Sequence, residues 1–139
     1  MTQENRKLLL QDLSARLTYG VKCVSGVDDA TLIIEGINPN CNGASEVQVT
    51  YERSGINFDT KISSIKPYLF PMLNMTDEQK EEYRKVCELD TEILSKHPMD
   101  GTPFPALYNS QDWLNKNHFD YRGLIEKGLA IDATNLNVY

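Results

Sequence analysis

Residues 46–52, with the sequence EVQVTYE, decide the fold because apolar and polar side chains alternate along them. Val47, Val49 and Tyr51 fall on one side of an extended chain, and the polar residues fall on the other. This alternation is typical of an antiparallel sheet with one face against a core and one face in water. The stretch therefore predicts a strand of a half-buried antiparallel sheet.

Similar short apolar runs lie on both sides of this stretch. They read VKCVSG at 21–26, TLIIEGI at 31–37 and INFDTKI at 56–62. The segments between the runs, GVDDA, NPNCNGAS and RSG, are rich in residues that favour turns. We therefore predict a meander of antiparallel strands.

The next segment, ISSIKPYLFPM at 62–72, contains Pro67 and Pro71. The two prolines exclude a helix interior and a central strand, so we expect the segment to run extended or to turn along the sheet. Its apolar side chains, Tyr68 and Phe70 among them, are expected to close one end of the sheet. A meander closed in this way resembles small SH3-like barrels, which are more typical of binding modules than of enzymes.

Helices are expected on both sides of the meander. Leucines at helical spacing predict an N-terminal amphipathic helix that ends at Gly20. Thr76 and Gln79 form a capping box that begins a charged surface helix with one thin apolar stripe. Ser110 and Asp120 are expected to cap two shorter helices, and a short strand or docked tail is expected after them.

The fold class is therefore α+β, with an N-terminal helix, an antiparallel strand meander and two to three short helices packed on it. A chain of 139 residues suits one domain. We expect residues 1–139 to form a single domain, with the helix and meander in 1–73 and a docked helical and loop extension in 74–139.

Charge and composition exclude several function classes. A net charge of −6 disfavours generic binding of nucleic acid, which needs clustered lysine and arginine side chains. The sequence has no signal peptide and no stretch long enough to span a membrane, so we expect a cytoplasmic protein. Cys23, Cys41 and Cys87 lack the spacing of a zinc site or a disulfide framework, and we expect free thiols.

No motif for a cofactor, a metal or catalysis stands out. The glycines do not form a phosphate-binding loop, and no metal-ligand pair is present. Cys23 or Cys87 could be combined with His118 and Asp120 into a triad, but nothing in the local sequence supports it. We expect no cofactor and no metal, and an enzyme is the least favoured class.

The segment DWLNKNHFDYRGLIEKGLAID, at 112–132, leaves two interpretations open. Its aromatic residues and Arg122 could form a platform that stacks on a base or grips an anion. Alternatively, Trp113 and Phe119 pack on the sheet while Arg122 pairs with a carboxylate, and we favour this second interpretation. The candidate contact residues for a ligand or partner are the following: Tyr68, Phe70, His118, Tyr121, Arg122 and Lys127.

Three stretches carry a resemblance to a known group. LLLQDLSARLTYGVK, ISSIKPYLFPM with MTDEQKEEY, and DWLNKNHFDYRGLIEKGLAIDATNLNVY resemble small uncharacterised proteins of gut bacteria and their phages or mobile elements. The resemblance covers about two thirds of the chain and is weakest over residues 25–60. It implies an intracellular accessory protein encoded by a phage or a similar element, and it implies no cofactor.

Three functions follow as hypotheses. The first is a non-enzymatic interaction protein that binds a host protein or a second copy of itself, with an exposed apolar patch that holds Tyr68, Phe70 or Phe104. The second is a protein that binds or sequesters a small anionic, nucleotide-like ligand in a basic pocket of Tyr121, Arg122 and Lys127. The third is an enzyme with His97 or His118 beside a carboxylate in a cleft.

Overall fold

The computed structural model describes residues 1–38, 46–98, 100–101 and 109–139. Helix α1, Gln3–Arg16, begins after Thr2, whose side chain accepts a hydrogen bond from the Asn5 backbone. A 3-10 turn, η1 (Leu17–Tyr19), follows, and Gly20 ends it in the left-handed conformation. The N-terminal helix is therefore confirmed.

The strand meander is also confirmed. The first four strands pair antiparallel in chain order, and the fifth strand returns to pair antiparallel with the first, which gives the order β4-β3-β2-β1-β5. In the register of β3, Val49 lies between Ile34 and Phe58. The strands are β1 (Lys22–Ser25), β2 (Thr31–Ile37), β3 (Val47–Tyr51), β4 (Asn57–Thr60) and β5 (Ile65–Pro71), the last preceded by the 3-10 turn η2 (Ile62–Ser64).

Strand β5 lies inside the sheet, so the prediction that its prolines exclude a central strand is wrong. Two short strands, β6 (Phe119–Asp120) and β7 (Ile131–Asp132), run parallel to it. Backbone groups alternate along a strand, so the nitrogens of Pro67 and Pro71 face the same edge as the Leu69 carbonyl. Along that edge β7 pairs with only two residues of β5, so the missing N–H groups break no continuous ladder.

The sheet is mixed and open over the described residues. Its order runs from β4 to β6, and no pairing joins these two strands there. The molecule is therefore α+β with an N-terminal helix, a mixed sheet and later helices, while a closed SH3-like barrel is not confirmed. The segment after residue 73 adds β6 and β7 to the same sheet.

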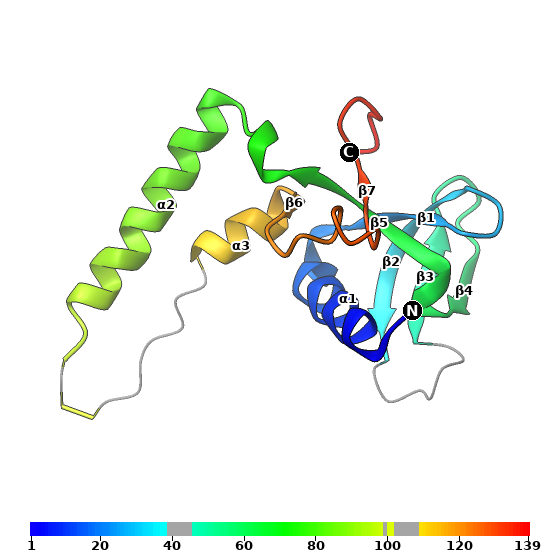
Figure 1. Cartoon of the computed structure of the whole chain (residues 1–139), viewed down its shortest axis with the longest axis horizontal. Helices are drawn as coiled ribbons and strands as arrows, with labels where there is room; N and C mark the ends of the chain where they lie inside the picture. Colours follow the sequence, from blue (N-terminus) through cyan, green and yellow to red (C-terminus); the bar gives the residue numbers. More distant parts are fainter. Residues whose placement is uncertain (39–45, 99, 102–108) are drawn as a thin grey trace.

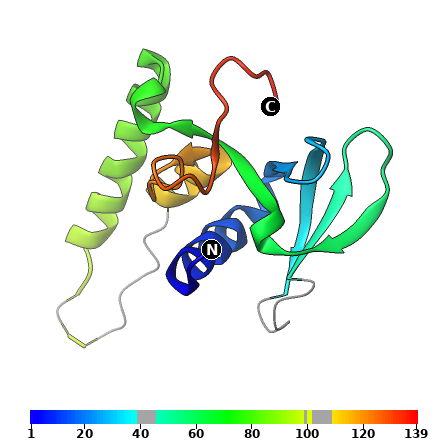
Figure 2. The same cartoon turned by 45° about the vertical axis from the view of Figure 1, so that its right-hand side comes forward.

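Two helices follow β5 and the 3-10 turn η3 (Met72–Asn74). Helix α2, Asp77–Ser95, has the predicted capping box of Thr76 and Gln79, and helix α3 spans Asn109–Lys116. The helix expected after Asp120 is wrong, because the chain forms turns there and Asp120 caps a turn rather than a helix. Figures 1 and 2 show α2 beside α3 and away from the strands of the meander.

The core has two parts. The larger lies between α1 and the sheet, and the smaller lies where α3, β6 and the start of α2 meet. Leu9, Leu13, Ile34, Val47 and Leu69 belong to the first, and Met75, Leu114 and Phe119 belong to the second. In the described part of the chain, no helix combines the length and the hydropathy that crossing a bilayer requires.

Candidate functional site

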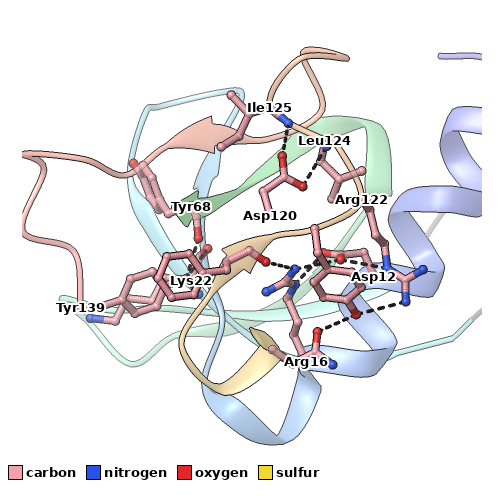
Figure 3. A network of polar contacts seen from close by, with 12 residues as sticks. Asp12, Arg16, Lys22, Tyr68, Asp120, Arg122, Leu124, Ile125 and Tyr139 are labelled. Carbon is pink, nitrogen blue, oxygen red and sulfur yellow. Dashed lines mark hydrogen bonds and ion pairs between the residues drawn. The ribbon is translucent and has the colours of Figure 1, made fainter. Parts of the chain in front are cut away.

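The segment 118–122 is tied to α1 by a buried ion pair. Asp12 and Arg16 are both 0% exposed, and the Arg16 Nε donates to Asp12 Oδ2 over 2.8 Å. A second guanidinium nitrogen of Arg16 donates to the Phe119 carbonyl over 2.7 Å. The pair therefore fastens β6 to the N-terminal helix, as Figure 3 shows.

Arg122 and Tyr121 join this network instead of reaching outward. The Arg122 Nε lies 3.2 Å from Asp12 Oδ1, and its side chain is 16% exposed. The Tyr121 hydroxyl donates to Asn115 Oδ1 over 2.9 Å, and the guanidinium carbons of Arg16 and Arg122 lie 5.3 Å and 4.9 Å from its ring centre. These contacts favour the structural interpretation of both residues.

The Asp120 side chain caps the turn that follows β6. Its two carboxylate oxygens accept hydrogen bonds from the Leu124 and Ile125 backbones, both over 2.9 Å. Burial raises the pKa of the Cys23 thiol to about 12, so this thiol stays protonated at neutral pH. A triad of Cys23, His118 and Asp120 therefore lacks a thiolate nucleophile. Its carboxylate is also not available to orient the histidine, because it accepts the two backbone hydrogen bonds.

A row of aromatic rings runs from α2 to the end of the chain. The rings of Trp113 and Phe119 are stacked, with centres 5.8 Å apart and planes 8° apart. Neighbouring ring centres along the row are separated by 3.7 to 6.2 Å. The rings in order are Tyr83, Trp113, Phe119, Phe70, Tyr139 and His118.

His118 is a strongly perturbed titratable group in this row. Burial, with the nearby charges of Arg16 and Lys22, lowers its pKa to about 4. Its backbone is left-handed, with φ of 61°, and its Nδ1 is buried without a hydrogen-bond partner. The ring is therefore neutral at pH 7 and contributes by stacking on Tyr139.

The remaining predicted residues are scattered. Tyr68 is buried, because β5 turns this side chain into the body of the protein, and so it is not part of an exposed apolar patch. Phe70 and His97 are half-buried, and Lys127 is exposed. Phe104, which was expected in an apolar patch, lies outside the described residues, as does Cys41.

Three surface pockets are formed by described residues. A pocket of about 250 Å³ lies at the base of α2, and two others of about 470 Å³ and 550 Å³ lie beside the β1–β2 turn and on α1. Tyr121, Arg122 and Lys127 line none of these three pockets. The pocket at the base of α2 is lined by Phe70, Asn74, Thr76, Gln79, Phe119, Thr134 and Asn135, none of them charged.

The sequence predicted α2 as a surface helix but did not single out its outer side as a candidate site. None of the nineteen residues of this helix, all of them described, is buried. Tyr83, Val86 and Cys87 are half-buried, as their spacing predicted, but Leu89 is 48% exposed on the flank of that stripe. Leu73, just before the helix, is 94% exposed. The spacing alone did not reveal how little of α2 the body covers.

The comparisons with known proteins leave the geometry as the basis for assigning function. The chain matches no family model, no curated protein and no solved structure. Within the described ranges, no group of three or more histidine, cysteine, aspartate or glutamate side chains is placed to hold a metal ion.

Proposed function

We propose that this protein is a non-enzymatic interaction protein that binds another protein through α2. The single observation that carries the proposal is a helix of nineteen residues without one buried residue. Most helices in folded proteins are stabilised by packing an apolar face against a body. A partner that covers Leu89 and its surroundings would supply burial that the chain itself does not supply to α2.

The charge of α2 indicates the chemistry of the partner. The helix carries seven acidic and three basic side chains, which gives it a net charge of −4. Arg84 pairs with Glu81 and Glu88 along the helix, and most of the other carboxylates face solvent. A partner surface that is apolar at its centre and basic at its rim would complement this face.

The strand arrangement and the resemblance to known small proteins also favour an interaction protein. A five-stranded meander whose last strand returns to the first, with a 3-10 turn before that strand, favours an SH3-like arrangement for residues 22–71. The resemblance to small proteins of phages and mobile elements favours a host protein as the partner and an intracellular location. The alternative, a basic pocket that binds an anionic ligand through Arg122, has less support, because Arg122 already pairs with Asp12.

The test compares two charge insertions at exposed apolar positions. Leu89→Glu changes α2, and Ile56→Glu changes the β3–β4 turn, where Ile56 is 62% exposed. We expect wild-type protein and Ile56→Glu, purified from the host lysate, to retain the same protein in native mass spectrometry. We expect Leu89→Glu to lose at least about nine tenths of it, since a charge would be buried in the interface.

Retention that is equal in all three proteins, or no retained protein with wild type, would contradict the proposal. A retained mass equal to a second copy of the chain would identify the partner as this protein itself. Melting curves serve as the control, because both substitutions are at exposed positions and should leave the folded state intact.

A further inference from the structure

The ladder between β1 and β5 is interrupted at one rung. Val24 lies opposite Lys66, and continuing this register by two residues places Lys22 opposite Tyr68. In an uninterrupted antiparallel ladder the Lys22 N–H would donate to the Tyr68 carbonyl. Further along β5, the Phe70 N–H donates to the His118 carbonyl over 2.8 Å. A slot therefore lies between the end of β1 and the start of β6.

Tyr139 fills this slot with its hydroxyl group. The Lys22 N–H donates to the hydroxyl over 3.0 Å, and the hydroxyl donates to the Tyr68 carbonyl over 2.9 Å. One side-chain group thus replaces the direct backbone bond and satisfies both partners, and Figure 3 shows Lys22, Tyr68 and Tyr139 together. The slot presents one donor and one acceptor, which match the acceptor and donor of a phenol.

The walls of the slot hold the ring of Tyr139. Its plane lies 9° from that of His118, with ring centres 3.7 Å apart, and the Phe70 ring centre is 6.0 Å away. The Lys22 ammonium lies 5.9 Å from the centre of the Tyr139 ring and donates to the Val138 carbonyl over 2.7 Å. Stacking, cation–π attraction and hydrogen bonding therefore act on one side chain.

The segment that carries Tyr139 contributes little else to the fold. Asn135, Leu136 and Asn137 are exposed, and the two asparagines have left-handed φ values of 68° and 50°. Tyr139 itself is 42% exposed, so the slot opens to the surface. Tyr139 can leave the slot without opening the core between α1 and the sheet.

We propose that this slot is a binding site for a tyrosine side chain, that Tyr139 occupies it in cis, and that a tyrosine of another polypeptide exchanges with it. A phenylalanine would leave the Lys22 N–H and the Tyr68 carbonyl unpaired, and a tryptophan could donate but not accept. The slot is separate from the exposed side of α2 and does not rest on the function proposed for that helix.

The experiment uses the full chain with Tyr139→Ala, which empties the slot. The probes are N-acetyl-tyrosinamide, N-acetyl-phenylalaninamide and a peptide of residues 133–139, and the readout is the NMR signal of the Lys22 amide. We expect both tyrosine probes to shift this signal and the phenylalanine probe to bind at least about tenfold more weakly. Wild-type protein should bind the tyrosine probes more weakly than Tyr139→Ala, because its own side chain competes.

Equal affinity for the tyrosine and phenylalanine probes, or no shift of the Lys22 amide with either tyrosine probe, would overturn the proposal. Should Tyr139→Ala not fold, Tyr139→Phe keeps the ring and takes its place, with the same expected order of affinities. A scrambled peptide that keeps the final tyrosine distinguishes the sources. Binding as tight as that of 133–139 indicates a tyrosine of any partner, and weaker binding indicates exchange between two copies of this chain.

Discussion

Asp12 and Arg16 place opposite charges inside the protein, where the charges are costly unless their hydrogen bonds are satisfied. The i, i+4 spacing on α1 lets the guanidinium meet the carboxylate, and Arg122 adds a second cation. The leucine spacing that predicts α1 gives no sign that Asp12 is buried. Only the return of residues 119–122 to α1 explains why these side chains are buried.

Asp12→Ala should therefore destabilise the fold strongly. We expect a loss of about 3–5 kcal/mol in the free energy of unfolding, because Arg16 would remain buried without its carboxylate. The matched control is Glu92→Ala, which breaks an exposed i, i+4 pair with Lys96 and should cost less than about 1 kcal/mol. Urea denaturation measures both, and a loss below 1 kcal/mol for Asp12→Ala would show that the buried pair contributes little.

His118 should make stability depend on pH. Its pKa is about 4 in the folded chain and near its ordinary value of 6.5 in the unfolded chain, so only the unfolded chain binds the proton between these values. The contribution is fully present above about pH 6.5 and is lost as the pH falls toward about 4. Most carboxylates titrate below about pH 5, so urea denaturation from pH 6.5 to 5 isolates His118.

His118→Asn is the control for this dependence, since asparagine tolerates the left-handed backbone and does not titrate. We expect its stability to change less over the same range of pH. A slope equal to that of wild type would assign the dependence to other groups.

At the scale of elements, local sequence patterns predicted the strands and helix starts that are set by neighbouring residues. The alternation at 46–52 and the capping box at 76–79 gave β3 and the start of α2 correctly. β6 and β7 have two residues each, and they exist because β5 offers them backbone partners. No periodicity can develop over two residues, so pairing over a long sequence distance is invisible in the pattern.

Trp113 of α3 contacts both α2 and β6, so its replacement tests how α2 and α3 are held against the sheet. The ring stacks on Phe119 and lies 5.4 Å, centre to centre, from Tyr83 of α2. We expect Trp113→Ala to lower the free energy of unfolding by about 3 kcal/mol, as the truncation of large packed aromatic residues does. An unchanged melting temperature would mean that the smaller core does not need this ring.

At the scale of the molecule, the composition and the strand pattern were enough to predict an α+β protein. The sequence favoured a carboxylate partner for Arg122 but could not identify it, because that partner, Asp12, lies on the first helix. The tail residue Tyr139 gave no signal, since Lys22 and Tyr68 meet it only after the sheet has formed. The Arg122–Asp12 pair and the slot of Tyr139 therefore both arise from contacts between distant segments.

The bond from Arg16 to the Phe119 carbonyl joins residues 103 positions apart, which has a consequence for synthesis. While a ribosome makes the chain, α1 emerges early, but Arg16 has to wait for the Phe119 carbonyl that accepts one of its hydrogen bonds. At about 5–20 residues per second, this wait lasts several seconds. The native contacts of these buried charges therefore form only after most of the chain has been translated.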